Sequence, residues 1–197
     1  MLVIGITGNF GTGKTSVSQM LAELGAATIN ADELGHELLQ PDTQTHKEIV
    51  AAFDESILEP NGEIDRNKLA KLVFDDTTAL ARLNQITHPK IYEIVKQRIE
   101  EYRHTGVKVV VLEAALLIEA GWTPLVNQLW VTIAPEAIIV RRLKSSRGLS
   151  DEQILARLHS QIPQEEKAKQ ADLVIDTDCS LDELRKRVTE LWQNLQR

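Results

Sequence analysis

The stretch GNFGTGKTS at residues 8–16 follows the apolar run LVIGI at residues 2–6, and it constrains the fold more than any other feature. It matches G-x-x-x-x-G-K-[ST], with Gly8, Gly13, Lys14 and Thr15 at the fixed positions. Glycines let successive backbone N–H groups turn toward an anion, and the helix that follows adds its positive end. Strand, loop and helix therefore predict a P-loop for nucleoside phosphates, with Lys14 on the β- and γ-phosphates and the Thr15 hydroxyl on Mg²⁺. The alternative is a glycine-rich turn that binds nothing, which this position after a strand disfavours.

Short apolar runs rich in β-branched residues recur along the chain and are separated by helical patterns. Such runs are typical of a buried parallel sheet, because both faces of each strand are covered. The sequence predicts an α/β, three-layer P-loop NTPase fold with a parallel five-stranded sheet. The expected strands are 2–6, 26–29, 107–112, 129–133 and 172–176.

Two segments depart from the alternation of strands and helices. Residues 31–104 read as almost wholly helical, with one turn at Pro60-Asn61-Gly62, and they predict a substrate-binding insertion. The stretch LKSSRGLS at 143–150 is expected to be irregular and to form part of a short lid. The chain is thus expected to be one domain over 1–197. Its core spans about 1–30, 105–143 and 170–197, with the helical lobe at about 31–104 and the lid region at about 144–168.

Composition excludes several classes of function. The chain has 197 residues, of which 43% are hydrophobic, and this fits one globular domain. A net charge of −7 argues against broad nucleic-acid binding, which needs a basic face. The single cysteine, Cys179, favours a reducing compartment. The apolar runs are too short for a membrane span and no signal peptide is evident, so a cytoplasmic protein without an obligate protein partner is expected.

Two carboxylates near strand ends are candidates for chemistry. Asp32, in TINADELGH, could accept a proton from a substrate hydroxyl, or it could cap a helix over Glu33–Leu39. The same residues match the D-x-x-G of GTPases, but N-K at 67–68 is followed by Leu69 and Ala70, so the guanine-reading N-K-x-D is missing. Glu113 could hold Mg²⁺ through water, or it could be a carboxylate that faces solvent.

The remaining candidates carry a structural alternative of similar weight. Arg141, Arg142, Lys144 and Arg147 could stabilise a transferred phosphoryl group, or they could be the solvated basic end of a helix. Thr87-His88-Pro89 on its own reads as a helix start with proline at the first position. The three tryptophans, Trp122, Trp130 and Trp192, are expected to pack in the interior.

Taken in order, these motifs resemble the dephospho-coenzyme A kinase family, of the P-loop nucleoside-monophosphate-kinase-like group. The likeness runs nearly end to end and is carried by GITGNFGTGKTSV, NADELGH, NGEIDRNKLAKLVF, ITHPKIYEIV, VLEAALLIEAG, RRLKSSRGLS and ARLHSQIPQEEKAKQADLVIDTD. The resemblance implies transfer of the γ-phosphate of ATP, with Mg²⁺, to the ribose 3′-hydroxyl of the small molecule dephospho-CoA.

The resemblance also assigns roles to single positions. Asp32 matches the acid near the acceptor hydroxyl, and Arg142 matches the arginine just before the lid. Arg66 and His88 match positions in the lobe that faces the acceptor substrate. The residues that match the ATP-phosphate loop are Gly11, Thr12, Gly13, Lys14, Thr15 and Ser16.

Four places depart from the family pattern. Asn30 stands where a first aspartate is usual, which leaves Asp32 as the acid, and Ala115 stands where a proline is usual. Ser146 occupies the usual place of a second lid arginine and Arg147 follows it, so either Arg147 substitutes or the lid has one cation fewer. Thr177 and Cys179 replace a common Asn and Gly, which could loosen the preference for the nucleotide base.

Two other functions stay open from the residues alone. One is another small-molecule P-loop kinase, acting on a nucleoside or nucleotide. The other is an NTP-hydrolysing switch, which the missing guanine motif and the large helical insertion disfavour.

Overall fold

The computed structural model describes residues 1–195 and separates them into two compact units. The first unit combines residues 1–30 with the chain from residue 96 onward, and the second is residues 31–95. Each unit is described by itself below.

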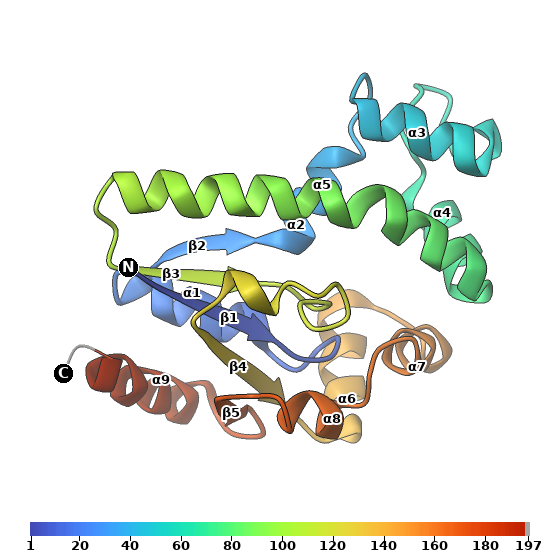
Figure 1. The fold of residues 1–197 in the computed structure, drawn as a ribbon. Coiled ribbons are helices and arrows are strands. Elements are labelled where there is room, and N and C mark those ends of the chain that lie inside the picture. Colours follow the sequence, from blue (N-terminus) through green and yellow to red (C-terminus); the bar gives the residue numbers. More distant parts are fainter. Residues whose placement is uncertain (196–197) are drawn as a thin grey trace. The chain divides into compact units, whose positions relative to one another are not determined.

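The first unit is built on a five-stranded parallel sheet with strand order β2-β3-β1-β4-β5 (Figure 1). This confirms the predicted three-layer α/β fold and each of its five strands, with ends shifted by two residues or fewer. Parallel pairing brings the carboxyl ends of all five strands to one edge of the sheet. There, Glu113 of β3 pairs with Ile6 of β1 on one side and with Asn30 of β2 on the other. The strands are β1 (Leu2–Thr7), β2 (Ala27–Asn30), β3 (Val109–Glu113), β4 (Gln128–Ile133) and β5 (Leu173–Asp176).

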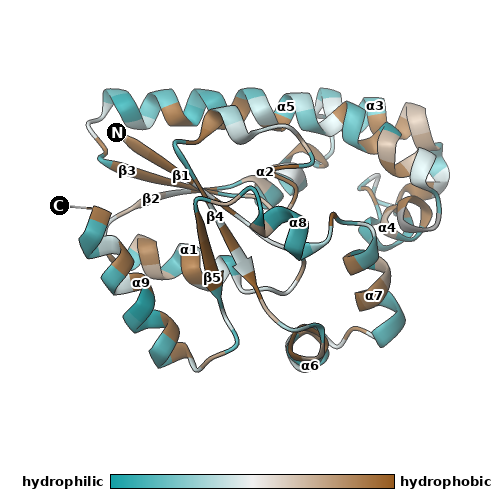
Figure 2. Ribbon diagram, turned by 60° about the horizontal axis from the view of Figure 1, so that its bottom comes forward, coloured by the Kyte–Doolittle hydropathy of each residue, from teal (hydrophilic) through white to brown (hydrophobic). Residues whose placement is uncertain are grey.

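Helices α1 (Lys14–Glu23) and α9 (Leu181–Leu195) lie side by side on one face of this sheet, and the end of α5, residues 96–104, lies on the other (Figures 1 and 2). Figure 2 shows the strands as mostly hydrophobic ribbon and the outer helix faces as hydrophilic. The buried face of α9 is formed by Leu184, Val188 and Trp192, whereas Leu181 at its start is 68% exposed. Trp122 and Trp130 are also buried, as expected.

The segment expected to be irregular, residues 143–150, is mostly helical, so that prediction was wrong. Helix α6 (Glu136–Arg147) runs through it and stops at Gly148, which takes the left-handed conformation that favours glycine (φ 63°). Ser150 then caps α7 (Asp151–His159) in a capping box with Gln153. Three residues, Gly148 to Ser150, therefore separate the two helices, and the serines before them continue α6. The short helix α8 (Gln164–Ala168) and the 3₁₀ turn η2 (Thr123–Leu125) complete this unit.

The second unit is helical but has more interruptions than the one that the sequence suggested. It contains α2 (Ala31–Leu38), α3 (Gln44–Phe53), the 3₁₀ turn η1 (Glu55–Ile57), α4 (Arg66–Asp75) and the first part of α5 (Thr77–His104). Asp54 ends α3 at a positive φ of 73°, and Leu58 pairs with Ile64 in an isolated antiparallel bridge. The apolar core of this unit is Ile49, Phe53, Ile57, Ile64, Leu69, Val73 and Ala79.

Pro89 lies inside α5 and does not begin a helix, so the interpretation of Thr87-His88-Pro89 as a helix start was wrong. Proline removes one helical hydrogen bond and clashes with the preceding turn. The helix persists because Thr87, Ile91 and Val95 are buried along one face, so packing offsets the lost bond. Among the helices of residues 1–195, none is both long and apolar enough to cross a bilayer.

Candidate active site

The loop of residues 8–16 leaves β1 at the edge where all five strands end, and its backbone requires glycine. Gly8 has φ 146°, and a Cβ there would lie 2.4 Å from both the carbonyl oxygen and the hydroxyl of Thr132 on β4. Gly13 has φ 87° and directly precedes α1. The loop can approach β4 and turn into the helix only because these two positions lack side chains. The N-terminus of α1 and the loop N–H groups therefore form the nest expected for a phosphate.

Lys14, the first residue of α1, folds back over this nest. Its ammonium donates to the carbonyl oxygens of Gly8 (3.1 Å) and Asn9 (3.2 Å), and the residue is buried. A buried ammonium needs such acceptors, because desolvation of an unpaired charge costs several kcal/mol. The positive charge is thus held over the loop by weak carbonyl partners that a phosphate oxygen can replace.

Thr15 and Glu113 form a pair at the carboxyl ends of β1 and β3. The Thr15 hydroxyl donates to Oε1 of Glu113 at 2.6 Å, and Glu113 is only 4% exposed. The prediction of a carboxylate that faces solvent was therefore wrong. A hydroxyl and a carboxylate oxygen side by side are ligands that Mg²⁺ prefers, directly or through water, so these residues fit the ion.

A third cluster braces the loop from β4 and from the chain after β5. The hydroxyl of Thr12 lies 2.7 Å from that of Thr132 and donates to the Asn9 carbonyl at 2.8 Å. Buried Thr177 donates to the Thr12 carbonyl at 2.9 Å and accepts from Arg142 at 3.0 Å. Arg142 also donates to the Thr177 carbonyl at 2.5 Å. The guanidinium of Arg142 is therefore tied through one threonine to the middle of the phosphate loop.

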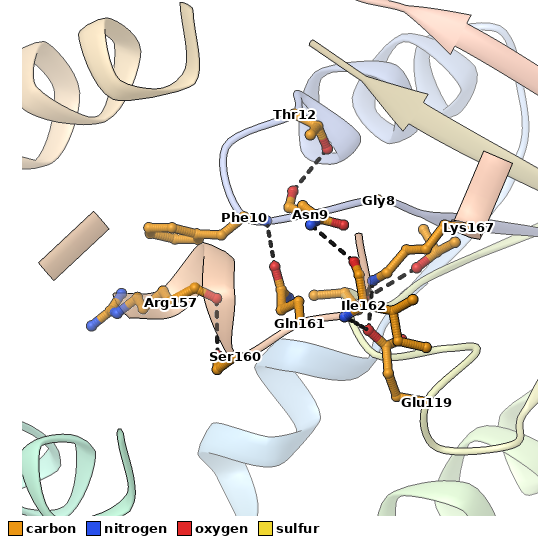
Figure 3. A network of polar contacts seen from close by, with 12 residues as sticks. Gly8, Asn9, Phe10, Thr12, Glu119, Arg157, Ser160, Gln161, Ile162 and Lys167 are labelled. Carbon is orange, nitrogen blue, oxygen red and sulfur yellow. Dashed lines mark hydrogen bonds and ion pairs between the residues drawn. The ribbon is translucent and has the colours of Figure 1, made fainter. Parts of the chain in front are cut away.

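The first half of the loop is held by the segment between α7 and α8 (Figure 3). The Phe10 N–H donates to Oε1 of Gln161 at 2.8 Å, and the Asn9 amide donates to the Ile162 carbonyl at 3.1 Å. The Ile162 N–H in turn donates to Oε1 of Glu119 at 3.3 Å. The segment that follows α7 thus holds the phosphate loop by one hydrogen bond to the Phe10 backbone and one to the Asn9 side chain.

Lys167 is linked through Glu119 to the segment between α7 and α8. It is fully buried, forms an ion pair with Oε1 of Glu119 at 2.8 Å, and donates to the Ala115 carbonyl at 2.8 Å (Figure 3). A buried ion pair is retained only when its geometry and hydrogen bonds compensate for desolvation, and removal of one partner is strongly destabilising. The chain after β3, which carries Ala115 and Glu119, is therefore joined to α8 by the buried ammonium of Lys167.

Two arginines that follow the loop in sequence lie over the Phe10 ring. The guanidinium carbons of Arg147 and Arg157 are 5.2 Å and 5.0 Å from the ring centroid. Burial, and then the positive charge of Arg147, lower the pKa of the Arg157 guanidinium. The structure thus places Arg147, which the sequence proposed as a lid cation, against the phosphate loop.

In the helical unit, Asp32 lies in the first turn of α2 and is exposed. The helix begins at Ala31, so the position before it belongs to Asn30, and the interpretation of Asp32 as a cap for Glu33–Leu39 was wrong. His36 follows one turn later; burial and then the charge of Arg66 lower its pKa, whereas Asp32 and Glu33 act to raise it. Asp32, His36 and Arg66 therefore form one electrostatic group, while His88 lies on α5.

The sequence motif identified the residues of the phosphate loop itself, but it did not identify the residues that hold the loop in place. Phe10 occupies a variable position of the motif, and nothing in the pattern marks its ring. Gln161 and Lys167 lie in QIPQEEK, a stretch that looks like a solvated charged helix. Only the burial of Lys167 distinguishes it from its exposed neighbour Lys169.

Comparison with known proteins gives a consistent result. The family model described as dephospho-CoA kinase matches residues 2–183. The dephospho-CoA kinase of Geobacter sulfurreducens is 45% identical over 192 residues, which cover 98% of each chain. A crystal structure of a Thermus thermophilus protein is 33% identical, with a TM-score of 0.81 over 98% of this chain and 97% of that one. The dephospho-CoA kinase structure from Campylobacter jejuni is 28% identical, with a TM-score of 0.71 over 98% and 96%.

Proposed function

This chain belongs to the dephospho-CoA kinase family, and from that premise we propose how its own residues perform the reaction. The enzyme uses ATP to phosphorylate dephospho-CoA in coenzyme A biosynthesis. We assign the ribose 3′-hydroxyl as the acceptor atom, with CoA and ADP as products. The observation that carries this proposal is the phosphate loop with its buried Lys14 and its Thr15–Glu113 pair at one end of the sheet.

The first step of the proposal is nucleotide binding. The backbone N–H groups of Gly11, Thr12, Gly13, Lys14, Thr15 and Ser16 bind the β- and γ-phosphates. Lys14 exchanges its contacts with the Gly8 and Asn9 carbonyls for phosphate oxygens, which are stronger acceptors because they are charged. Thr15 and Glu113 are the residues that would hold Mg²⁺, whose charge would stabilise the negative oxygens of the phosphates.

The second step is presentation of the acceptor hydroxyl. Asp32 orients the hydroxyl and accepts its proton, at a stage when the bond to the leaving ADP is already weakened. Support for this role comes from its exposure in the first turn of α2, where it does not serve as a helix cap. Arg66 and His88 bind the rest of the acceptor, and the charge of Arg66, which acts on His36, suits a substrate that carries phosphate.

The third step is stabilisation of the transferred group. Arg142 and Arg147 supply positive charge next to the oxygens of the phosphoryl group during its transfer, and they help to exclude water from that group. Arg142 is supported in this role by its anchor on Thr177, which holds it at a fixed place beside the loop. Arg147 takes the place of the usual second lid arginine at Ser146, which instead donates to the Arg142 carbonyl within α6.

The proposal is tested by release of ADP from ATP and Mg²⁺ with and without dephospho-CoA, together with the mass of the product. Strong stimulation and a product with one added phosphate, placed on the 3′-oxygen by ³¹P NMR, are expected. Stimulation by a nucleoside or nucleotide, with no response to dephospho-CoA, would contradict the assigned acceptor. ADP release that no small acceptor stimulates would contradict a kinase function altogether.

A further inference from the structure

Phe10 is a residue of the phosphate loop that none of the roles above uses. It occupies a position where the motif accepts any residue, yet two guanidiniums lie over its ring, Arg147 at 5.2 Å and Arg157 at 5.0 Å. Both distances fall within the roughly 6 Å over which the negative face of a ring attracts a cation. An aliphatic side chain at this position could bury the same surface but could not attract either charge.

The two cations come from two different helices and both lie over this ring. On α6, Ile139 and Leu143 point at the loop, since a Cβ on Gly11 would lie 2.8 Å from each of them. Arg147 is one turn beyond Leu143 on the same face and so continues that contact to Phe10. Arg157 lies on α7, which packs on α6 through Ile154 and Leu158.

The ring itself has little freedom to move. The backbone N–H of Phe10 donates to Gln161 (Figure 3). The Phe10 side chain packs against the apolar cluster that joins α6 and α7. Two guanidiniums over one ring carry like charges and repel each other, and burial and then the charge of Arg147 lower the pKa of Arg157. A fixed ring therefore keeps two like charges close together beside an anion-binding loop.

We propose that Phe10 is a positioning residue, whose ring holds the guanidiniums of Arg147 and Arg157 at the edge of the phosphate loop in readiness for a nucleoside triphosphate. Long arginine side chains lose rotamer freedom when they bind a ligand, and a ring that has already ordered them reduces that cost. The triphosphate also removes the repulsion between the two cations. This inference rests only on the nucleotide-binding half of the proposed function.

The test is direct binding of MgATP, measured by calorimetry on the full chain without any acceptor. Phe10→Leu keeps an apolar side chain but removes the ring, whereas Phe10→Tyr keeps the ring face. We expect Phe10→Leu to weaken binding by about three- to tenfold and Phe10→Tyr to stay within about twofold of the parent chain. Arg185→Gln, which removes an exposed guanidinium paired with Glu23 on α1, is the matched control and should not change the affinity.

A double-mutant cycle separates this role from simple packing. Arg157→Gln should weaken MgATP binding less in the Phe10→Leu chain than in the parent chain, because the ring no longer positions Arg157. Equal losses in both backgrounds would overturn the proposal, as would equal losses in Phe10→Leu and Phe10→Tyr. Thermal unfolding checks that each variant is folded. If Phe10→Leu does not fold, Phe10→Met, whose side chain is also apolar and similar in volume to leucine, replaces it. A failure of dephospho-CoA to stimulate ADP release would contradict the assigned acceptor and leave this binding test unchanged.

Discussion

The phosphate loop and the helix that carries Asp32 are held in place by different means. The loop is fixed by hydrogen bonds from three other segments: buried ones from Thr132 on β4 and from Thr177 beyond β5, and a partly buried one from Gln161 after α7. Asp32 lies exposed in the first turn of α2, and its charge and that of Arg66 act in opposite directions on the pKa of His36. The loop is organised by short, directional bonds, whereas the charges on the helical surface act together on one histidine.

The difference has a chemical meaning. A loop that binds the same triphosphate in every turnover gains from a geometry that needs no rearrangement. A region that receives a large acceptor and releases a larger product gains from residues whose contacts can change. We therefore expect substitutions in the loop to reduce ATP affinity and turnover together, and substitutions near Asp32 to spare ATP affinity.

The largest effect is expected from Lys14→Ala. The substitution removes the buried ammonium that the loop carbonyls hold over the phosphate nest. We expect kcat/KM for ATP to fall by about 1000-fold, since the charge acts on both the bound and the transferred phosphate. Steady-state kinetics measure this, and circular dichroism confirms that the sheet is intact. Near-parent kinetics would remove Lys14 from the mechanism.

Asp32→Asn should separate the two regions most clearly. We expect kcat to fall by about 100-fold, because the amide cannot accept the proton of the acceptor hydroxyl. Affinity for MgATP, measured without acceptor, should match that of the parent chain. Glu33→Gln, the adjacent acid in the same turn, is the matched control and should retain most turnover. A loss of MgATP affinity in Asp32→Asn would contradict the separation of roles.

A smaller effect is expected from Glu113→Gln. The amide keeps the shape of the side chain and can still accept from Thr15, but it carries no charge toward Mg²⁺. The Mg²⁺ concentration for half-maximal activity should rise by about tenfold, the lower end of what loss of a supporting carboxylate costs. Titration with Mg²⁺ at fixed ATP measures this, and an unchanged midpoint would show that Glu113 only orients Thr15.

The same contrast explains what the sequence could predict. A P-loop has one workable backbone, so its motif predicted the strand, the glycine conformations and the place of Lys14 and Thr15 residue by residue. The short apolar strands likewise predicted the parallel sheet, because only buried strands read as continuous β-branched runs. The helical region has no such local rule, and its breaks at Asp54 and around Leu58–Ile64 went unpredicted.

The bracing residues escaped prediction for a physical reason. Lys167, Glu119 and Gln161 are charged or polar residues whose partners lie more than 40 residues away in sequence, such as the 52 between Lys167 and Ala115. Pro89 was misinterpreted in the same way, since local preference favours a helix start and the buried face of α5 overrides it. The roles of Asp32, Arg66, His88 and Arg142 stay predictions that the experiments above address.

The smallest effect concerns the electrostatic group around Asp32, and it can be measured without substrate. Burial and then the charge of Arg66 lower the pKa of His36 from its ordinary value of 6.5. The folded state therefore disfavours the protonated imidazole, so its contribution to stability is present above that value and is lost as the pH falls. Arg66→Gln should raise the pKa of His36, and Glu33→Gln should lower it further, because Glu33 acts to raise it. NMR titration of the His36 ring in the two variants gives both signs, and an unchanged pKa in Arg66→Gln would show that charge does not organise this surface.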